Sequence, residues 1–135
     1  MKIDLLDKVR VFSIKGHQIK DLGKILLDPN ELITFKTLSG KNYDFAAKDW
    51  GFYATPSIND RLKREGFKTA LVVNENNQLY IMVVEEDKLD LFSKYLKKNQ
   101  DNKEICWLDD FYNLDKKYKF YHQIFSLYNK LKGLQ

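Results

Sequence analysis

The stretch FKTALVVNENNQLYIMVVEE, residues 67–86, contains two apolar runs separated by a polar tetrapeptide. The runs predict two strands, at about 68–74 and 78–85. The NENN segment supplies the turn between them, because Asn tolerates a positive φ angle better than most residues. Since both runs are almost continuously apolar, we expect both strands to be central in a sheet and covered on both faces.

Strand patterns continue on both sides of this hairpin. Further strands are expected at residues 8–14, 31–38, 43–54 and 103–108. The SGKN segment at 39–42 predicts a hairpin turn, and Gly51 is expected at a bulge or a point of close approach. Residues 17–30 fit no single pattern and their structure stays open; one interpretation is an irregular loop with a short strand at 24–27.

Three helices are expected. The first would occupy residues 56–65, with Thr55 as N-cap, Pro56 at the first helical position and Gly66 at the C-terminal end. The second would run over 88–98 after Asp87. The third would run from Asp109 or Asp110 to about Lys132. Together these elements predict one α+β domain over residues 1–135. It would contain a mostly antiparallel sheet of five or six strands, two or three helices and a long C-terminal helix.

Composition narrows the functional classes. The chain has 135 residues, a net charge of +4 and a single cysteine, which excludes an intramolecular disulfide framework and a cysteine-based zinc cage. No 18-residue apolar run and no signal-peptide pattern occur, so we expect no membrane span and a cytoplasmic location. The charge excess is mild, and acidic residues interrupt the basic ones along most of the chain. Nucleic-acid binding is therefore not the leading hypothesis.

The segment DWGFYATPSINDRLKREG, residues 49–66, is the candidate ligand site. The N-terminus of the expected helix would offer free N–H groups to a phosphate or carboxylate. Arg61 could hold such an anion in a bidentate way, and aromatic residues upstream could form a wall against a sugar or base. The predicted ligand-binding residues are Trp50, Tyr53, Thr55, Ser57, Asn59 and Arg61.

A structural explanation of the same residues stays open. In this interpretation Thr55 and Pro56 serve only to start a helix, and the aromatic residues belong to the core. Arg61 would then pair with Asp49 or Glu65.

The same region carries a resemblance. GFYATPSINDRLKREGFKTALVVN, continuing through LYIMVVEEDKLDLFSKYL to WLDDF, resembles small uncharacterised bacterial proteins found among surface-polysaccharide biosynthesis genes. The likeness covers about residues 43–111. It implies an accessory role near nucleotide-sugar or glycan assembly, with a nucleotide-sugar or another anionic small molecule as ligand, and it implies no catalytic residue.

No motif identifies a reaction. Walker A, GxGxxG and GxSxG sequences are absent, and the two histidines, His17 and His122, show no metal-ligand spacing. We therefore expect no cofactor and no metal, and the sequence leaves open whether the protein is an enzyme.

The C-terminal helix suggests an alternative function. Apolar residues recur on it at three- and four-residue spacing, in a first row of Phe111, Leu114, Tyr118, Tyr121, Phe125 and Tyr128. A second row consists of Phe120, Ile124, Leu127 and Leu131. So wide an apolar face predicts coverage by the sheet or by another subunit. The alternative is thus a non-catalytic homo-oligomeric or partner-binding module acting through residues 111–131. Nucleic-acid binding is the third hypothesis.

Overall fold

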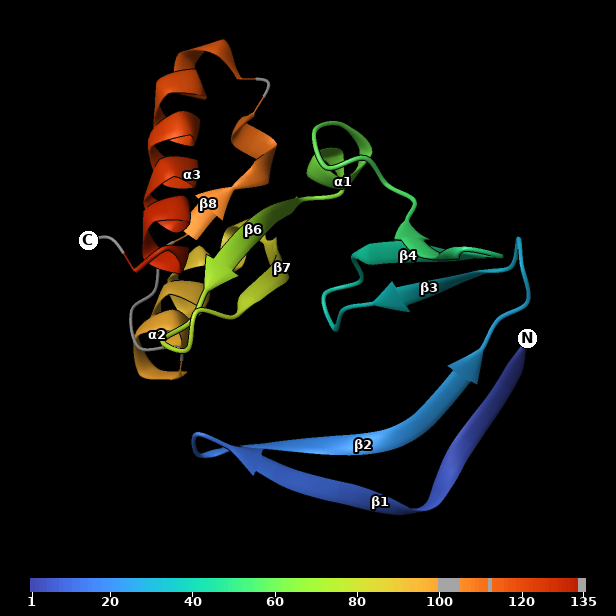
Figure 1. Cartoon of the computed structure of the whole chain (residues 1–135). Coiled ribbons are helices and arrows are strands. Elements are labelled where there is room, and N and C mark those ends of the chain that lie inside the picture. The colour runs from blue at the N-terminus through green and yellow to red at the C-terminus, as the bar shows by residue number, and fades with distance from the viewer. Residues whose placement is uncertain (100–104, 112, 134–135) are drawn as a thin grey trace. The chain divides into compact units, whose positions relative to one another are not determined.

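The computed structural model describes residues 1–99, 105–111 and 113–133 (Figure 1). The side chains of Asn99 and Leu114 also lie outside the description. The chain forms two compact units, residues 1–55 and 56–135, and each is described here by itself. The fold is α+β, as expected. The described strands are all antiparallel, but they form three small sheets instead of one sheet of five or six strands.

Unit 1 begins with a long two-stranded hairpin of β1 (Lys2–Ile14) and β2 (His17–Leu26). Lys15 and Gly16 both have positive φ angles, as a two-residue hairpin turn requires. The register passes from the pair Leu5–Gly23 to the pair Arg10–Asp21, so four residues of β1 stand opposite one of β2. The strand expected at 8–14 is confirmed within the longer β1. The structure of residues 17–30, which the sequence left open, is mostly extended, because His17–Leu26 pairs with β1.

The second sheet of unit 1 contains β3 (Leu32–Lys36), β4 (Asn42–Lys48) and β5 (Gly51–Ala54). The hairpin of β3 and β4 confirms the turn expected at SGKN. The single strand expected over 43–54 is wrong, because the chain reverses at residues 49–50 and β5 pairs back on β4. Gly51 has a positive φ angle, so it permits this reversal and does not mark a bulge in a continuous strand.

Unit 2 is built around a three-stranded sheet with the order β7-β6-β8. Its strands are β6 (Phe67–Val73), β7 (Leu79–Glu85) and β8 (Ile105–Trp107). The turn between β6 and β7 places Asn77 at positive φ, as the Asn-rich turn predicts. β6 is central and mostly buried, as expected. β7 is an edge strand with exposed Leu79, Tyr80 and Ile81, so the expectation that it is central is wrong. An apolar run in the sequence predicts a strand, but it does not show whether a further strand pairs with its other edge.

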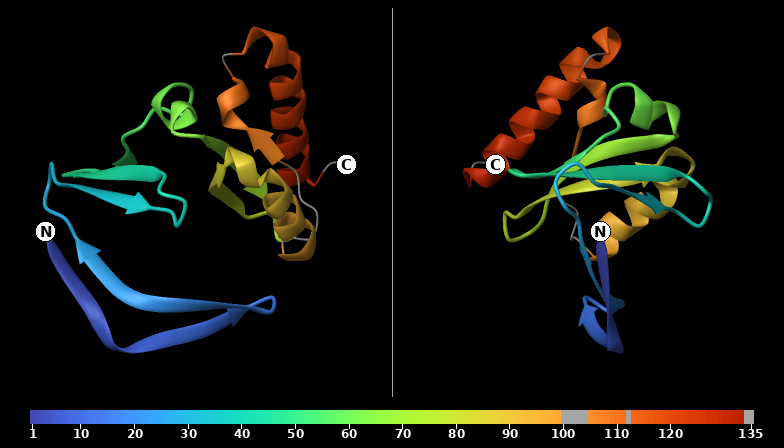
Figure 2. Two further views of the ribbon diagram at one scale, coloured as in Figure 1. Left: turned by 180° about the vertical axis from the view of Figure 1, so that it is seen from behind. Right: turned by 90° about the vertical axis from the view of Figure 1, so that its right-hand side faces the viewer.

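Helices α2 (Leu89–Asn99) and α3 (Lys117–Leu131) cover opposite faces of this sheet (Figure 2). Alternation along β6 explains the arrangement, because successive side chains point to opposite faces. Ala70 and Val72 pack with Leu96 of α2, whereas Val73 packs with Phe120 and Leu127 of α3. Short 3-10 turns precede both helices: η1 (Glu86–Lys88), η2 (Leu108–Asp110) and η3 (Leu114–Lys116).

Two helix starts differ from expectation. The helix predicted at 56–65 is reduced to α1 (Arg61–Arg64), with Asp60 as N-cap. Thr55 instead continues the pairing of β4 and β5: its N–H donates to the carbonyl of Asp44 at 2.9 Å, and its hydroxyl lies 3.5 Å from the same oxygen. The last helix begins at Lys117 instead of Asp109 or Asp110, since these two aspartates are buried within η2. No helix in the described part of the chain has both the length and the apolar character to span a bilayer.

Candidate functional site

The predicted ligand site divides at the boundary between the two units. Trp50, Tyr53 and Thr55 belong to unit 1, and Ser57, Asn59 and Arg61 belong to unit 2. Two pairs among the six come together: the rings of Trp50 and Tyr53, and the hydroxyl of Ser57 with the backbone of Arg61. Asn59 is exposed.

Trp50 and Tyr53 form a stacked aromatic pair at the β4–β5 turn. Their ring centroids lie 6.0 Å apart with an interplanar angle of 27°, and the two residues are 69% and 43% exposed. Strand alternation alone predicts that these rings face opposite ways. That prediction is wrong because Trp50 lies in the turn before β5 and is free of the alternation. A stacked, exposed pair offers a flat apolar platform to a sugar ring or a base.

The helix-terminus basis for an anion site is wrong. Backbone groups at the start of α1 already have partners within the turn: the Ser57 hydroxyl accepts from Arg61 N–H at 3.1 Å, and the Ser57 carbonyl accepts from Leu62 N–H at 2.9 Å. The Asp60 carboxylate accepts from the Arg64 guanidinium at 3.0 Å. One turn of helix also has too few aligned peptide dipoles to attract an anion strongly. The ligand-binding role of these residues stays a prediction, without this support.

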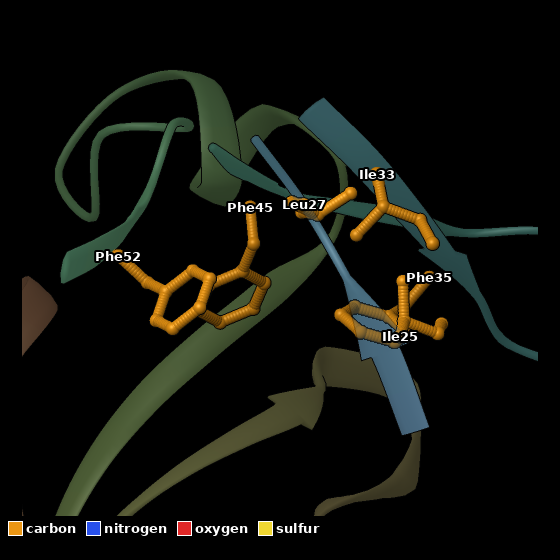
Figure 3. A pocket seen from close by; sticks show the side chains of 6 residues that line it. All are labelled: Ile25, Leu27, Ile33, Phe35, Phe45 and Phe52. Atoms are coloured by element: carbon orange, nitrogen blue, oxygen red, sulfur yellow. The ribbon is translucent and has the colours of Figure 1, made fainter. Parts of the chain in front are cut away.

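A hollow of about 320 Å³ lies within unit 1 (Figure 3). Its lining consists of the hydrocarbon side chains of Ile25, Leu27, Ile33, Phe35, Phe45 and Phe52. Ligand pockets of this size normally add a few polar groups that orient the ligand. Because these side chains carry no polar atom, the hollow suits an apolar group and does not suit a nucleotide sugar.

A second exposed aromatic surface lies on α3. We call Tyr118, Tyr121, Phe125 and Tyr128 the aromatic row; their exposed fractions are 86%, 50%, 61% and 54%. Their three- and four-residue spacing places them along one side of the helix. The opposite side carries buried Phe120 and Leu127, which pack on the sheet. Of the second row predicted from sequence, Phe120 and Leu127 therefore lie in the core, whereas Leu131 is 38% exposed. Tyr112 and the side chain of Leu114 lie outside the described residues.

Basic residues accompany the aromatic row. Residues 116–135 contain five lysines and no acidic residue. Lys117 Nζ lies 5.8 Å from the ring centroid of Tyr121, and Lys132 Nζ lies 5.7 Å from that of Tyr128. Both distances suit cation–π attraction, which places positive charge beside the rings.

A buried polar cluster, which sequence reasoning missed, joins β6 to the segment after β8. Asp109, 4% exposed, accepts from the backbone N–H of Thr69 at 3.1 Å, and its second oxygen lies 4.0 Å from Lys68 Nζ. Lys68 Nζ also lies 4.5 Å from the ring centroid of Trp107. Backbone pairing of β8 with β6 stops at Ala70. The Asp109 side chain therefore extends the hydrogen bonding of β6 by one residue, to Thr69. The only sign of this buried cluster in the sequence was the pair of adjacent aspartates, Asp109 and Asp110.

Two further groups in this region are chemically notable. Burial raises the pKa of the Cys106 thiol to about 11, and the nearby Asp110 charge adds to the effect. Cys106 is therefore a core residue and a poor nucleophile. Asp110 Oδ2 and Thr69 Oγ1 are buried with no hydrogen-bond partner among the described residues, for which we have no physical account. Within the same residues, no group of three potential ligands is arranged to hold a metal ion.

Comparisons with protein-family models, with curated proteins and with solved structures find no match for this chain. The resemblance to proteins of surface-polysaccharide gene clusters thus stays a prediction. The function of the protein has to be argued from its own side chains.

Proposed function

We propose that this protein is a non-catalytic binding module whose working surface is the aromatic row of α3. Its partner is a protein segment that carries acidic residues beside an apolar anchor. One observation carries the proposal: four large rings, each at least half exposed, line one side of a helix in a stretch without a single acidic residue.

The exposed rings support a protein partner. Tyr and Phe are enriched in the buried centres of protein interfaces, where a few aromatic anchors supply most of the binding free energy. Exposed apolar side chains scattered singly need no explanation, but a continuous patch marks an interaction surface. Phe120 and Leu127 anchor α3 to the sheet, whereas each ring of the aromatic row stays at least half exposed.

Charge supports an acidic partner. Opposing two copies of α3 would bring six lysines together with no acidic residue from either helix, which disfavours the version of the hypothesis in which residues 111–131 form a homo-oligomer. An acidic segment would gain from the same lysines, and their attraction would speed its association. Nucleic acid shares the negative charge, but its binding would fall steeply with added salt.

Selection from a displayed peptide library against the immobilised full chain tests the proposal. We expect enriched peptides to combine Asp or Glu with a Leu, Phe or Trp. Fluorescence anisotropy should then show at least a tenfold loss of affinity for the double variant Tyr121→Ser/Phe125→Ser. The matched control is Leu91→Ser on α2, because Leu91 is 63% exposed and Phe125 is 61% exposed. Failure to enrich such peptides, or equal affinity in both variants, overturns the proposal. Preferential, salt-sensitive binding of single-stranded RNA would favour the third hypothesis.

A second candidate function is binding of a nucleotide sugar or another sugar-bearing anion by unit 1, as in an accessory protein of surface-polysaccharide metabolism. The stacked and exposed pair of Trp50 and Tyr53 favours it. Calorimetry against a panel of nucleotide sugars should show binding by the wild type and loss of binding by Trp50→Ala. Arg61→Ala tests separately whether the guanidinium contributes. No heat with the wild type would remove this candidate.

A further inference from the structure

The β1–β2 hairpin is a two-stranded ribbon, and within unit 1 almost all of its residues are exposed. All 13 residues of β1 are exposed, and so are all but two of the ten residues of β2. An isolated two-stranded hairpin is marginally stable at best in water; it needs further strands or a packed face. The backbone edges of both strands are also open, because the described sheet contains only these two strands.

One side of the ribbon is apolar. Residues paired across the strands share a side, and alternation along β2 extends that side from His17 to Ile25. We call this side the hairpin face. Its large apolar residues, each at least 40% exposed, are Ile3, Leu5, Phe12, Ile14, Ile19 and Ile25. The other side is mixed: it carries exposed Val11 and Leu26 together with Lys2, Asp4, Ser13, Gln18, Lys20 and Lys24.

We propose that the hairpin face is a dimer interface and that its occupant is a second copy of this chain. Six half-exposed apolar side chains offer on the order of 500 Å² of apolar surface. A standard interface buries roughly 800 Å² per partner, of which a little over half is apolar. The hairpin face therefore matches the requirement of a stable dimer. A two-fold axis would place the same face of each copy against the other.

Charge on the hairpin face permits self-association. Its charged residues, Arg10 and Asp21, neutralise each other in an ion pair of 2.7 Å, so two faces can meet without opposing like charges. The aromatic row lacks this property, because α3 carries three lysines and no acidic residue. The apolar surface also continues beyond the hairpin, because Ile25 is at the same time a lining residue of the 320 Å³ hollow. This inference uses a surface different from the one in the proposed function, and either can fail without the other.

Sedimentation velocity on the full chain gives the first test. The monomer has a mass of 16.1 kDa, and we expect the wild type to sediment at twice that mass at tens of micromolar concentration. Phe12→Glu should sediment as a monomer. The matched control is Val11→Glu, since Val11 is the adjacent residue, 50% exposed on the opposite side, where it stands across from Lys20. We expect this control to remain dimeric, and so should Tyr121→Ser/Phe125→Ser.

Hydrogen exchange shows whether a variant is monomeric because its interface is lost or because it is unfolded. Residues 67–73 in the core of unit 2 should stay protected in every variant. Amides of β1 and β2 should gain protection with rising protein concentration in the wild type and in Val11→Glu, but not in Phe12→Glu. If Phe12→Glu unfolds the chain, the milder Ile19→Ser is measured in its place. A monomeric wild type, or the same oligomeric state for the variant and Val11→Glu, overturns the proposal; a monomer with a protected hairpin would show that the same chain covers it.

Discussion

The carboxylate of Asp109 accepts a hydrogen bond from the backbone N–H of Thr69 across 40 residues of sequence, and both residues are buried. This bond joins the end of β8 to the central strand at the point where their backbone pairing has stopped. A side chain thus replaces a strand in satisfying an N–H group that cannot reach water.

Replacing Asp109 should lower stability through this N–H group. In Asp109→Ala the Thr69 N–H loses its partner, and Lys68 loses the nearest carboxylate, so we expect a loss of about 1–3 kcal/mol in the free energy of unfolding. Urea denaturation followed by circular dichroism measures it. Asp109→Asn keeps an acceptor oxygen and should lose less. Equal losses in both variants would mean that the charge matters more than the hydrogen bond.

Gln123 plays a similar part at the outer edge of β8. Its side-chain carbonyl accepts from the backbone N–H of Trp107 at 3.0 Å, so α3 closes an otherwise open strand edge. Gln123→Ala should cost about 1 kcal/mol in urea denaturation. His122→Ala, at an exposed neighbouring position, should change stability by less than about 0.5 kcal/mol. A larger effect of the histidine variant would contradict the assignment.

The two sides of α3 should respond oppositely to truncation. Leu127 is 2% exposed in the core, so Leu127→Ala should destabilise unit 2 by about 2–5 kcal/mol. Phe125 lies two residues away and is mostly exposed, so Phe125→Ala should cost less than about 1 kcal/mol although it removes a larger side chain. Thermal unfolding of the two variants at equal protein concentration makes the comparison. Similar losses would show that the aromatic row is covered within the chain.

Cys106 should resist modification while the protein is folded. Its side chain is fully buried and its pKa is raised to about 11, so almost no thiolate is present at pH 8. Ellman's reagent should react with it slowly in buffer and at once in 6 M guanidinium chloride. Rapid reaction in buffer would indicate frequent opening of the core around β8.

The same pKa predicts a loss of stability at high pH. Between pH 9 and about 11 the unfolded thiol, with an ordinary pKa of 9.0, releases its proton while the folded thiol keeps it. Folding therefore becomes less favourable as pH rises through this range, by at most about 1.4 kcal/mol per pH unit. Other groups also titrate there, so the measurement is the difference between wild type and Cys106→Ala. A difference that does not change between pH 8 and pH 10 would contradict the predicted shift.

Local patterns predicted several elements well. The hairpin of β6 and β7 and that of β3 and β4 appear where apolar or β-branched runs flank Asn- or Gly-containing turns. These predictions succeed because turn chemistry and side-chain alternation act over a few residues. The stripe of α3 also separated into its two rows by spacing alone, although the spacing did not tell which row would face the sheet.

Predictions from local patterns were wrong where contacts with residues distant in the sequence decide the local structure. Thr55 has the side chain of a helix cap, but its N–H and its hydroxyl are both directed at the carbonyl of Asp44 in the sheet, and the helix begins six residues later. Trp50 reads as a strand residue, but the reversal at residues 49–50 turns it onto Tyr53. Within the predicted ligand site, the stacking of Trp50 on Tyr53 could not be predicted from the sequence, because it depends on the turn at residues 49–50.

The sequence by itself determined the α+β class, the two hairpins of β3–β4 and β6–β7, and the aromatic, lysine-rich character of the last helix. These properties follow from composition and short-range periodicity. Only the tertiary structure decided that β7 is an edge strand, that Asp109 completes the hydrogen bonding of β6, and which apolar residues stay exposed on α3 and on the hairpin face. Burial depends on which surfaces meet, and contacts between residues far apart in the chain leave no periodic signal in the sequence.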